Sequence, residues 1–270
     1  MKYDLGFTKA QASGNDFIII DNRDGSLDKR GLDYPEIARD LCRRRLSVGA
    51  DGILALERSD KADLRMRIIN PDGSEVTMCG NGARCSAYYA FSKGVGSDLL
   101  METGAGIIKA RISGGRVKLL MSDPGDIKMS VNLGIGQTLL TVHSLNTGVP
   151  HAVHMVEDLE NYPVVEMGRR IRHHSFFAPG GTNANFVGNI VSGGASLRTY
   201  ERGVEDETLA CGTGTVASAV VLGLLGVVEP PVSMKTRGGE TLTVHYQISK
   251  GKVTDVYLEG EAHLVFEGKA

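Results

Sequence analysis

The sequence lacks a large charge of either sign and a long apolar run. Its formal net charge is -2 over 270 residues, so nothing in this balance suggests a nucleic acid or another polyanion as partner. The longest apolar run, residues 216–228, is shorter than a membrane span and is interrupted by Gly223 and Gly226. Residues 1–22 show no basic start followed by an apolar run and a cleavage site, so we expect neither an export signal nor membrane attachment.

Several motifs of metal, nucleotide and redox chemistry are also missing. There is no Cys-x-x-Cys pair, no glycine-rich turn ending in Gly-Lys-Ser/Thr and no Gly-x-Ser-x-Gly elbow. Cys79 and Cys85 are matched by no second pair, and His173 and His174 stand at no ligand spacing from them, which disfavours zinc. A lysine motif typical of pyridoxal phosphate (PLP) is likewise not evident, so we expect neither a cofactor nor a metal. The cysteines fit free thiols in a reducing cytoplasm.

Two near-identical cysteine turns are the main feature that the chain does have. Cys79 begins Cys-Gly-Asn-Gly and Cys211 begins Cys-Gly-Thr-Gly, and an Ala-rich stretch follows each turn. A thiol at a helix N-terminus lies in a positive field and ionises more easily. A buried cysteine can also be a small hydrophobic residue, which is our interpretation of Cys42 and Cys85. Two thiols in equivalent places instead suggest an acid and a base that face each other.

The cysteine turns belong to a repeat that spans the chain. Four features recur in the same order at offsets of 131 to 136 residues, which indicates duplicated halves whose loops differ in length. The matched pairs are Arg67 and Arg198, Cys79 and Cys211, Thr103 and Thr236, and Gly115 and Gly251. We place the boundary in the turn-rich segment 122–125. The first half is then 1–124, joined by 263–270, and the second is 125–262.

The periodicity predicts the fold class. Residues 81–91 and 213–225 read as helices that are apolar nearly all round, which is typical of a buried helix. Two amphipathic helices are expected at 34–45, where Arg43, Arg44 and Arg45 would form the last turn, and at 163–172. We expect an α+β fold of two pseudo-symmetric domains, each a curled, mostly antiparallel sheet around a central helix. The strand-like runs are 17–21, 53–57, 64–70, 107–112, 117–121, 184–187, 197–201, 241–247 and 253–258.

The paired thiols suggest a reaction. If the halves pack about a pseudo-two-fold axis, both helix N-termini point at one cleft and can hold an anion there. A carboxylate in that cleft would place its neighbouring carbon between the two thiols. Removal of the α-proton on one face and its return on the other inverts the stereocentre. Backbone dipoles would have to hold the charge that develops on the carbon.

These residues resemble the diaminopimelate epimerase family over essentially the whole chain. The Asn-Gly-Ala-Arg-Cys ending and the Glu-Arg-Gly strand distinguish the chain from proline racemases, which share the fold and the paired cysteines. Phenazine-biosynthesis isomerases lack the cysteines. The motifs that carry the resemblance are Ser13-Gly14-Asn15-Asp16-Phe17, Gly49-Ala50-Asp51-Gly52, Asn70-Pro71-Asp72-Gly73-Ser74-Glu75, Cys79-Gly80-Asn81-Gly82-Ala83-Arg84-Cys85, Gly181-Thr182-Asn183, Tyr200-Glu201-Arg202-Gly203 and Ala210-Cys211-Gly212-Thr213-Gly214.

The resemblance implies PLP-independent epimerisation of LL-2,6-diaminopimelate to the meso form, in lysine and peptidoglycan precursor biosynthesis, by a cytoplasmic homodimer. It implies that Cys79 and Cys211 act as base and acid and exchange roles with direction. Arg202 would pair with the distal carboxylate, and His151 and Glu201 would tune the thiols. The implied substrate-binding residues are Asn15, Asn70, Gly80, Asn81, Asn183, Glu201, Arg202, Gly212 and Thr213.

Departures and alternatives stay open at this point. Val149 stands where many family members carry Asn, and Gly52 stands where some carry Gln, so those side-chain contacts to substrate are absent. Asn15 and Asn70 also suit ordinary turns, Arg202 a surface strand end, and His151 a turn cap. A racemase for another amino acid, such as proline or a hydroxyproline, is one rival function. A duplicated amino-acid-binding protein is the other, although binding needs no thiols.

Overall fold

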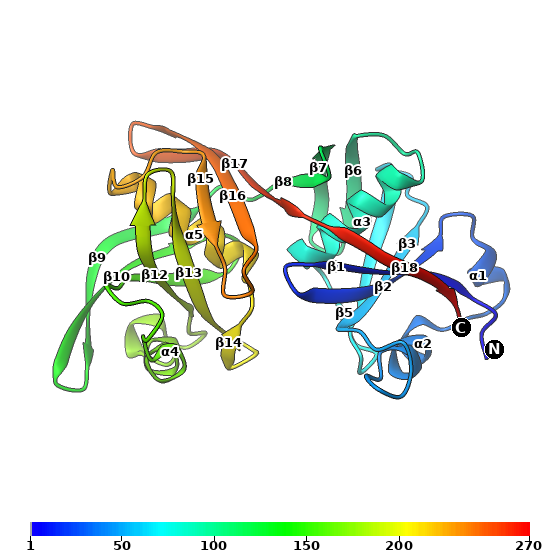
Figure 1. Ribbon diagram of the computed structural model, residues 1–270, viewed down its shortest axis with the longest axis horizontal. Coiled ribbons are helices and arrows are strands. Elements are labelled where there is room, and N and C mark those ends of the chain that lie inside the picture. The colour runs from blue at the N-terminus through cyan, green and yellow to red at the C-terminus, as the bar shows by residue number, and fades with distance from the viewer. Residues whose placement is uncertain (1) are drawn as a thin grey trace. The chain divides into compact units, whose positions relative to one another are not determined.

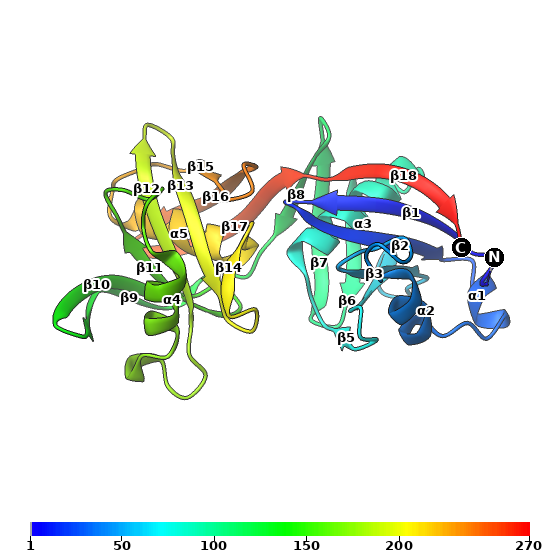
Figure 2. The ribbon, with the colours of Figure 1, turned by 60° about the horizontal axis from the view of Figure 1, so that its bottom comes forward.

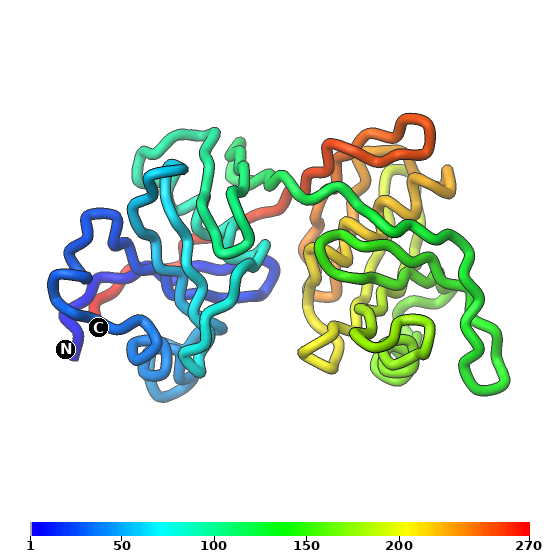
Figure 3. Tube along the Cα trace, turned by 180° about the vertical axis from the view of Figure 1, so that it is seen from behind, coloured from blue at the N-terminus to red at the C-terminus, as the bar shows by residue number. Residues whose placement is uncertain are grey.

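The computed structural model describes residues 2–270 and divides into two compact units. Unit 1 comprises the chain up to Leu119 together with Gly260–Ala270, and unit 2 is Leu120–Glu259 (Figure 1). The sequence had placed these divisions at residues 124 and 262. Leu5 and Ala270 exchange two backbone hydrogen bonds of 3.0 and 2.9 Å, so the C-terminal end lies beside the start of the first strand (Figure 3).

Unit 1 is a curled sheet with a helix in its centre. Its strands run β18-β1-β2-β3-β4-β6-β7-β8 in space, and β5 also pairs with β4. The β2–β3 and β4–β6 pairs are parallel and the others antiparallel. The elements are β1 (Gly6–Ala12), β2 (Asn15–Asn22), α1 (Ser26–Lys29), α2 (Tyr34–Leu41), β3 (Gly52–Glu57), β4 (Leu64–Ile69), β5 (Glu75–Val76), α3 (Gly80–Ser92), β6 (Asp98–Thr103), β7 (Gly106–Ser113), β8 (Arg116–Leu120) and β18 (His263–Lys269).

Unit 2 repeats this topology. Its strands run β9-β10-β11-β12-β13-β15-β16-β17, with β14 paired to β13. The two parallel pairs, β11–β12 and β13–β15, fall at the same places as in unit 1. The elements are β9 (Gly125–Ile135), β10 (Thr138–Asn146), β11 (Pro150–Met155), α4 (Val164–Arg172), η1 (Ser175–Phe177), β12 (Asn183–Val191), β13 (Gly194–Glu201), β14 (Asp206–Thr208), α5 (Gly212–Leu224), β15 (Val232–Lys235), β16 (Thr241–Ser249) and β17 (Lys252–Glu261).

The central helices α3 and α5 are buried because strands of the same unit surround them. In α3, Ala83, Ala87 and Ala90 are fully buried, and the helix contacts β1, β2, β3, β4, β7 and β18 (Figure 2). In α5, Val216 and Val220 belong to the apolar core that β13, β15 and β16 complete. Small and β-branched side chains on all faces allow the strands to approach closely. The predicted fold class, two repeated halves around buried helices, is confirmed.

One predicted helix end is wrong. Helix α2 ends at Leu41, not at residue 45. The chain leaves the helix through backbone bonds from Gly49 to Leu41 and from Ala50 to Cys42, and Arg45 has a positive φ of 67°. The arginine run is therefore a turn after the helix, which frees Arg44 to reach carboxylates outside it.

Candidate active site

In unit 1, Cys79 is the N-cap residue of α3. Its backbone is extended (φ -149°) and the Gly82 N–H donates to its Sγ at 3.5 Å. The thiol in turn donates to Asn15 Oδ1 at 3.7 Å. Cys79 therefore lies where the unpaired N–H groups of a helix start favour negative charge, as the sequence predicted, and Asn15 lies against it.

Asn15 is held by a carboxylate that the sequence did not single out. Its Nδ2 donates to Asp51 Oδ2 at 2.6 Å. Arg44 donates to the other oxygen, Asp51 Oδ1, at 2.7 Å and also pairs with Asp16. Because Asp51 accepts from the amide nitrogen, the amide oxygen of Asn15 is the atom left to face the Cys79 thiol.

The remaining predicted residues of unit 1 lie at two turns. Asn70 follows β4 and closes a turn with Ser74, by backbone (2.8 Å) and side-chain (3.0 Å) bonds. Gly80 and Asn81 are the first two residues of α3, so their N–H groups are available to an anion. Arg84, which is fully buried, donates to Asn81 Oδ1 at 3.0 Å and fixes that side chain.

In unit 2, Cys211 is the N-cap residue of α5 and is only 7% exposed. Burial, and after it the charge of Glu201, raises the pKa of its thiol to about 12, against hydrogen bonds with Thr213 and Gly214. The sequence had predicted an easily ionised thiol here. Burial outweighs the helix field, so Cys211 is a protonated thiol at neutral pH.

Glu201 closes strand β13 near Cys211. Burial raises the pKa of its carboxyl, against a hydrogen bond from Thr208 Oγ1 to Oε2 of 3.0 Å. By the strand registers and the repeat, Glu201 takes in unit 2 the place of Asn70 in unit 1. The two cysteines thus have surroundings of different charge.

Asn183, Arg202 and His151 come together beside the Cys211 turn in unit 2. Asn183 donates to the Pro150 carbonyl at 3.1 Å and accepts from the Arg202 N–H at 2.8 Å. His151, directly after Pro150, is fully buried. Burial lowers the pKa of its imidazole to about 3, with the charge of Arg202 acting in the same direction. His151 is therefore neutral and is no surface turn cap.

The Cys211 turn is also tied to the loop before β11. Thr147 Oγ1 donates to the Thr213 carbonyl at 3.0 Å. Val149, in the same loop, has no polar side chain to offer. Gly212 and Thr213 begin α5 and present their N–H groups as Gly80 and Asn81 do in α3.

Sequence reasoning missed four residues that hold these side chains in place. Asp51 was quoted within a motif but given no role, and Thr147 gave no signal. Asn185 lies two residues after Asn183 in β12, and Thr199 on the neighbouring strand β13 is its hydrogen-bond partner. Alternation along a strand places Asn183 and Asn185 on one side of the sheet, which was a readable signal. Cys42 and Cys85 are buried, as predicted.

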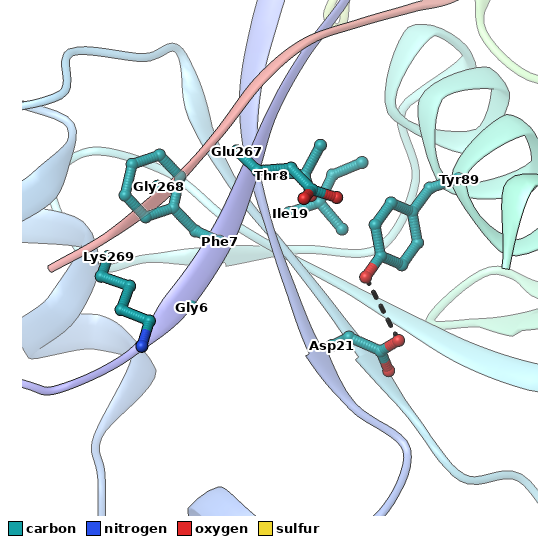
Figure 4. A pocket seen from close by; sticks show the side chains of 9 residues that line it. All are labelled: Gly6, Phe7, Thr8, Ile19, Asp21, Tyr89, Glu267, Gly268 and Lys269. Atoms are coloured by element: carbon teal, nitrogen blue, oxygen red, sulfur yellow. Dashed lines mark hydrogen bonds between the residues drawn. The ribbon is translucent and has the colours of Figure 1, made fainter.

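A cavity of about 470 Å³ lies in unit 1, away from the predicted site residues. Phe7, Asp21 and Tyr89 line it together with the end of β18 (Figure 4), and Tyr89 donates to Asp21 at 3.3 Å.

Within residues 2–270, no cluster of three or more His, Cys, Asp or Glu side chains could hold a metal ion. None of the helices in that range is both long and apolar enough to cross a membrane.

Comparison with solved structures first identifies the fold. A phenazine biosynthesis protein of the PhzF family from Bacillus anthracis aligns over 98% of both chains with a TM-score of 0.69 and 18% identity. A hydroxyproline epimerase from Agrobacterium vitis aligns over 98% of this chain and 90% of its own, with a TM-score of 0.68 and 16% identity. These structures share the fold of two repeated halves.

Sequence comparison then identifies the family. The family model described as diaminopimelate epimerase matches residues 7–128 and 143–265. The diaminopimelate epimerase of Aquifex aeolicus is 42% identical over 98% of this chain and 97% of its own length. That of Methanothrix thermoacetophila is 40% identical over 98% and 95%. The chain belongs to the diaminopimelate epimerase family, and with it to the amino-acid epimerases, a class of isomerases.

Proposed function

We propose that this protein interconverts LL- and meso-2,6-diaminopimelate without a cofactor, using Cys79 and Cys211 as acid and base. One observation carries the mechanism beyond family membership. The two thiols are the N-cap residues of α3 and α5, which occupy equivalent places in the duplicated topology. A reaction that treats the two faces of one carbon almost equally suits two equivalent groups.

The proposed step moves one proton off the α-carbon and another onto it. The thiolate of one cysteine takes the α-proton and becomes a thiol, while the C–H electron pair stays on the carbon. The thiol of the other cysteine gives its proton to the opposite face and becomes a thiolate. Cys211 is protonated at neutral pH, so it is the donor and Cys79 the base in the direction that starts from this form.

The carboxylate beside the reacting carbon needs donors as charge develops on it. The N–H groups of Gly80, Asn81, Gly212 and Thr213 begin α3 and α5, and helix starts stabilise such an anion. Asn15, Asn70, Asn183 and Glu201 hold the rest of the substrate, and Arg202 binds the distal carboxylate. His151 and Glu201 adjust the pKa of the Cys211 thiol.

The test is epimerisation of diaminopimelate in deuterium oxide. We expect the wild type to incorporate deuterium at the α-carbon without added cofactor. Cys79→Ala and Cys211→Ala should each lose more than about a thousandfold in kcat, because each removes a reacting group. Cys42→Ala, a buried thiol elsewhere in unit 1, is the matched control and should keep its activity.

Two outcomes would overturn this function. Turnover of proline or hydroxyproline with none of diaminopimelate would identify a different racemase. Tight binding of an amino acid with no deuterium incorporation would identify a binding protein. Deuterium exchange that survives in both cysteine variants would refute the mechanism, but diaminopimelate would remain the proposed substrate.

We further propose that the protein acts as a cytoplasmic homodimer. Its membership of a biosynthetic enzyme family supports this location. Val265 and Phe266 on β18 are 58% and 48% exposed, beside the cavity lined by the end of that strand, and an exposed apolar patch favours association. Sedimentation should give twice the monomer mass, and Phe266→Glu should shift it to the monomer. A wild type that sediments as a monomer contradicts this proposal.

A further inference from the structure

Three buried polar side chains form a layer beneath the Cys211 turn. This polar layer consists of His151 on β11, Asn185 on β12 and Thr199 on β13, each at most 2% exposed. A Cβ atom placed on Gly214 would lie only 2.3 Å from Asn185 Oδ1. The turn that carries Cys211 therefore packs directly on Asn185.

Unit 1 has an apolar layer at the same place. In β2, β3 and β4, Leu54 pairs with Ile19 and Ile68, as Asn185 pairs with Val153 and Thr199 in unit 2. Phe17 pairs with Gly52 as His151 does with Asn183. Phe17, Leu54 and Ile68 thus correspond to His151, Asn185 and Thr199.

The apolar layer of unit 1 shows whether packing alone requires polar residues at this place. Phe17, Leu54 and Ile68 are all buried, and a Cβ on Gly82 would meet Leu54 at 2.9 Å, so the first turn packs on its layer in the same way. The fold therefore accepts an apolar layer here. Buried polar groups are unfavourable unless they are hydrogen-bonded, so the polar layer of unit 2 points to a role other than packing.

The hydrogen bonds of Asn185 fix where its amide nitrogen and oxygen lie. The Ala152 carbonyl, 3.1 Å away, can only accept, so the atom facing it is Nδ2. The Thr199 hydroxyl donates to Oδ1 at 3.0 Å. The same Nδ2 lies 3.1 Å from His151 Nδ1, so Nδ1 must be the acceptor in that contact.

A neutral imidazole whose Nδ1 accepts carries its proton on Nε2. Among the described residues, the buried Nε2 atom of His151 has no hydrogen-bond partner. It is therefore an N–H donor that the folded protein leaves unused. The polar layer packs on the turn of Cys211 through Asn185 and Gly214. A Cys211 thiolate can accept a further hydrogen bond beside those from Thr213 and Gly214.

We propose that Asn185 is a positioning residue that holds His151 as the Nε2–H tautomer, so that the imidazole donates to the Cys211 thiolate and cannot act as a base. Thr199 and Ala152 fix the Asn185 amide in the required orientation. The inference rests on the proposed function for the identity of the anion. The tautomer itself follows from the hydrogen bonds alone.

The first experiment reads the tautomer directly. Protein labelled with ¹⁵N-histidine is examined by NMR at neutral pH, and the His151 signals are assigned by their loss in His151→Gln. We expect a protonated Nε2 and an unprotonated Nδ1. In Asn185→Asp the carboxylate can only accept, so the proton should move to Nδ1. Asn132→Asp makes the same change at an exposed strand residue bonded to Thr141 and should leave the His151 signals unchanged.

A protonated Nδ1 in the wild type, or an unchanged tautomer in Asn185→Asp, overturns the proposal. The wild-type spectrum decides even if Asn185→Asp does not fold. An Nε2–H signal in a protein that does not epimerise diaminopimelate refutes the proposed function and leaves the tautomer assignment standing.

The second experiment copies the apolar layer of unit 1 into unit 2. The double variant Asn185→Leu with Thr199→Ile should fold, because unit 1 packs with these residues. We expect kcat to fall on the order of a hundredfold with KM nearly unchanged, as for loss of an oriented donor, and His151 to show a mixture of tautomers. Thr199→Ser keeps the hydroxyl and should retain both kcat and the wild-type tautomer. An undiminished kcat in the folded double variant contradicts the positioning role.

Discussion

Burial of His151 links the stability of unit 2 to pH. Burial lowers the pKa of its imidazole from 6.5 to about 3, with Arg202 adding to the effect. Below pH 6.5 the unfolded chain binds a proton here that the folded chain excludes, so this contribution to the free energy of unfolding falls as pH falls. The slope is at most about 1.4 kcal/mol per pH unit, down to about pH 3.

The variant His151→Phe tests this linkage, because Phe17 fills the corresponding place in unit 1. Urea unfolding measured from pH 7 to 4 should show a smaller loss of stability in this variant than in the wild type. His173→Phe, at a histidine whose side chain is 61% exposed, is the control and should keep the wild-type slope. Parallel slopes in all three proteins would contradict the linkage.

Glu201 provides a second test at the scale of single residues. Its negative charge raises the pKa of Cys211, second to burial, so Glu201→Gln should lower that pKa. The Cys211 titration is the thiolate absorbance of a Cys79→Ser protein minus that of the Cys79→Ser, Cys211→Ser double variant. Glu205→Gln changes an exposed carboxylate that pairs with Arg172. This variant should leave the pKa of Cys211 unchanged. An upward shift in Glu201→Gln would refute the assigned cause.

The sequence could not show these electrostatic effects, although it did indicate the residues. The helix-start rule captures the local field at Cys79 and Cys211, but the burial of Cys211 depends on the strands packed around it. Asn15 was predicted as a ligand, while its partner Asp51 is visible only once β2 and the turn before β3 lie side by side. Residue types are local information, and their partners are set by tertiary structure.

At the scale of elements, the buried helices were predictable and several strands were not. Helices α3 and α5 begin at the Cys-Gly turns and consist mainly of small and apolar residues, which is the pattern of a buried helix. Strand β1 has buried Thr8 and Lys9, and Lys9 is tolerated there because it pairs with Asp16 at 2.6 Å. Strand β9 is mostly exposed. Strand β1 therefore lacks the alternation of apolar residues that predicts a strand, whereas β9 has this alternation from Ile127 to Ile135 and was overlooked.

Helix α4 lies on β13 through a glycine, which gives a test of this packing. A Cβ on Gly168 would lie 2.3 Å from the Cβ of Tyr200. Alanine normally stabilises a helix by about 1 kcal/mol over glycine, but here it would force α4 away from the sheet. We expect Gly168→Ala to lower the free energy of unfolding by about 1–3 kcal/mol in urea titrations.

The control for this change is Gly6→Ala on β1, where an added Cβ has nothing within 4 Å. It should change stability by less than about 0.5 kcal/mol. A Gly168→Ala protein more stable than the wild type would show that α4 adjusts freely, and would contradict the close packing.

At the scale of the whole molecule, the repeat is not contiguous in the chain. Strand β9 begins the spatial order of unit 2, and its counterpart in unit 1 is β18, which comes from the C-terminal end. The first half therefore folds completely only after the second half has been made. Composition and motif spacing revealed the duplication, and the return of 263–270 to the first half was predicted together with the domain boundaries.

This arrangement predicts an unequal effect of C-terminal truncation. Residues of β18 pair with β1 from Gly6 to Gln11, and at about 1 kcal/mol for each hydrogen bond their loss should destabilise unit 1 on the order of 5 kcal/mol. The core around α5 contains no residue of β18. Deletion of residues 263–270 should therefore remove hydrogen-exchange protection from β1 and β2, whereas α5 and β12 keep theirs. Equal loss of protection in both units would show that they unfold as one, because an uncovered β1 can weaken α5 only through a shared cooperative transition.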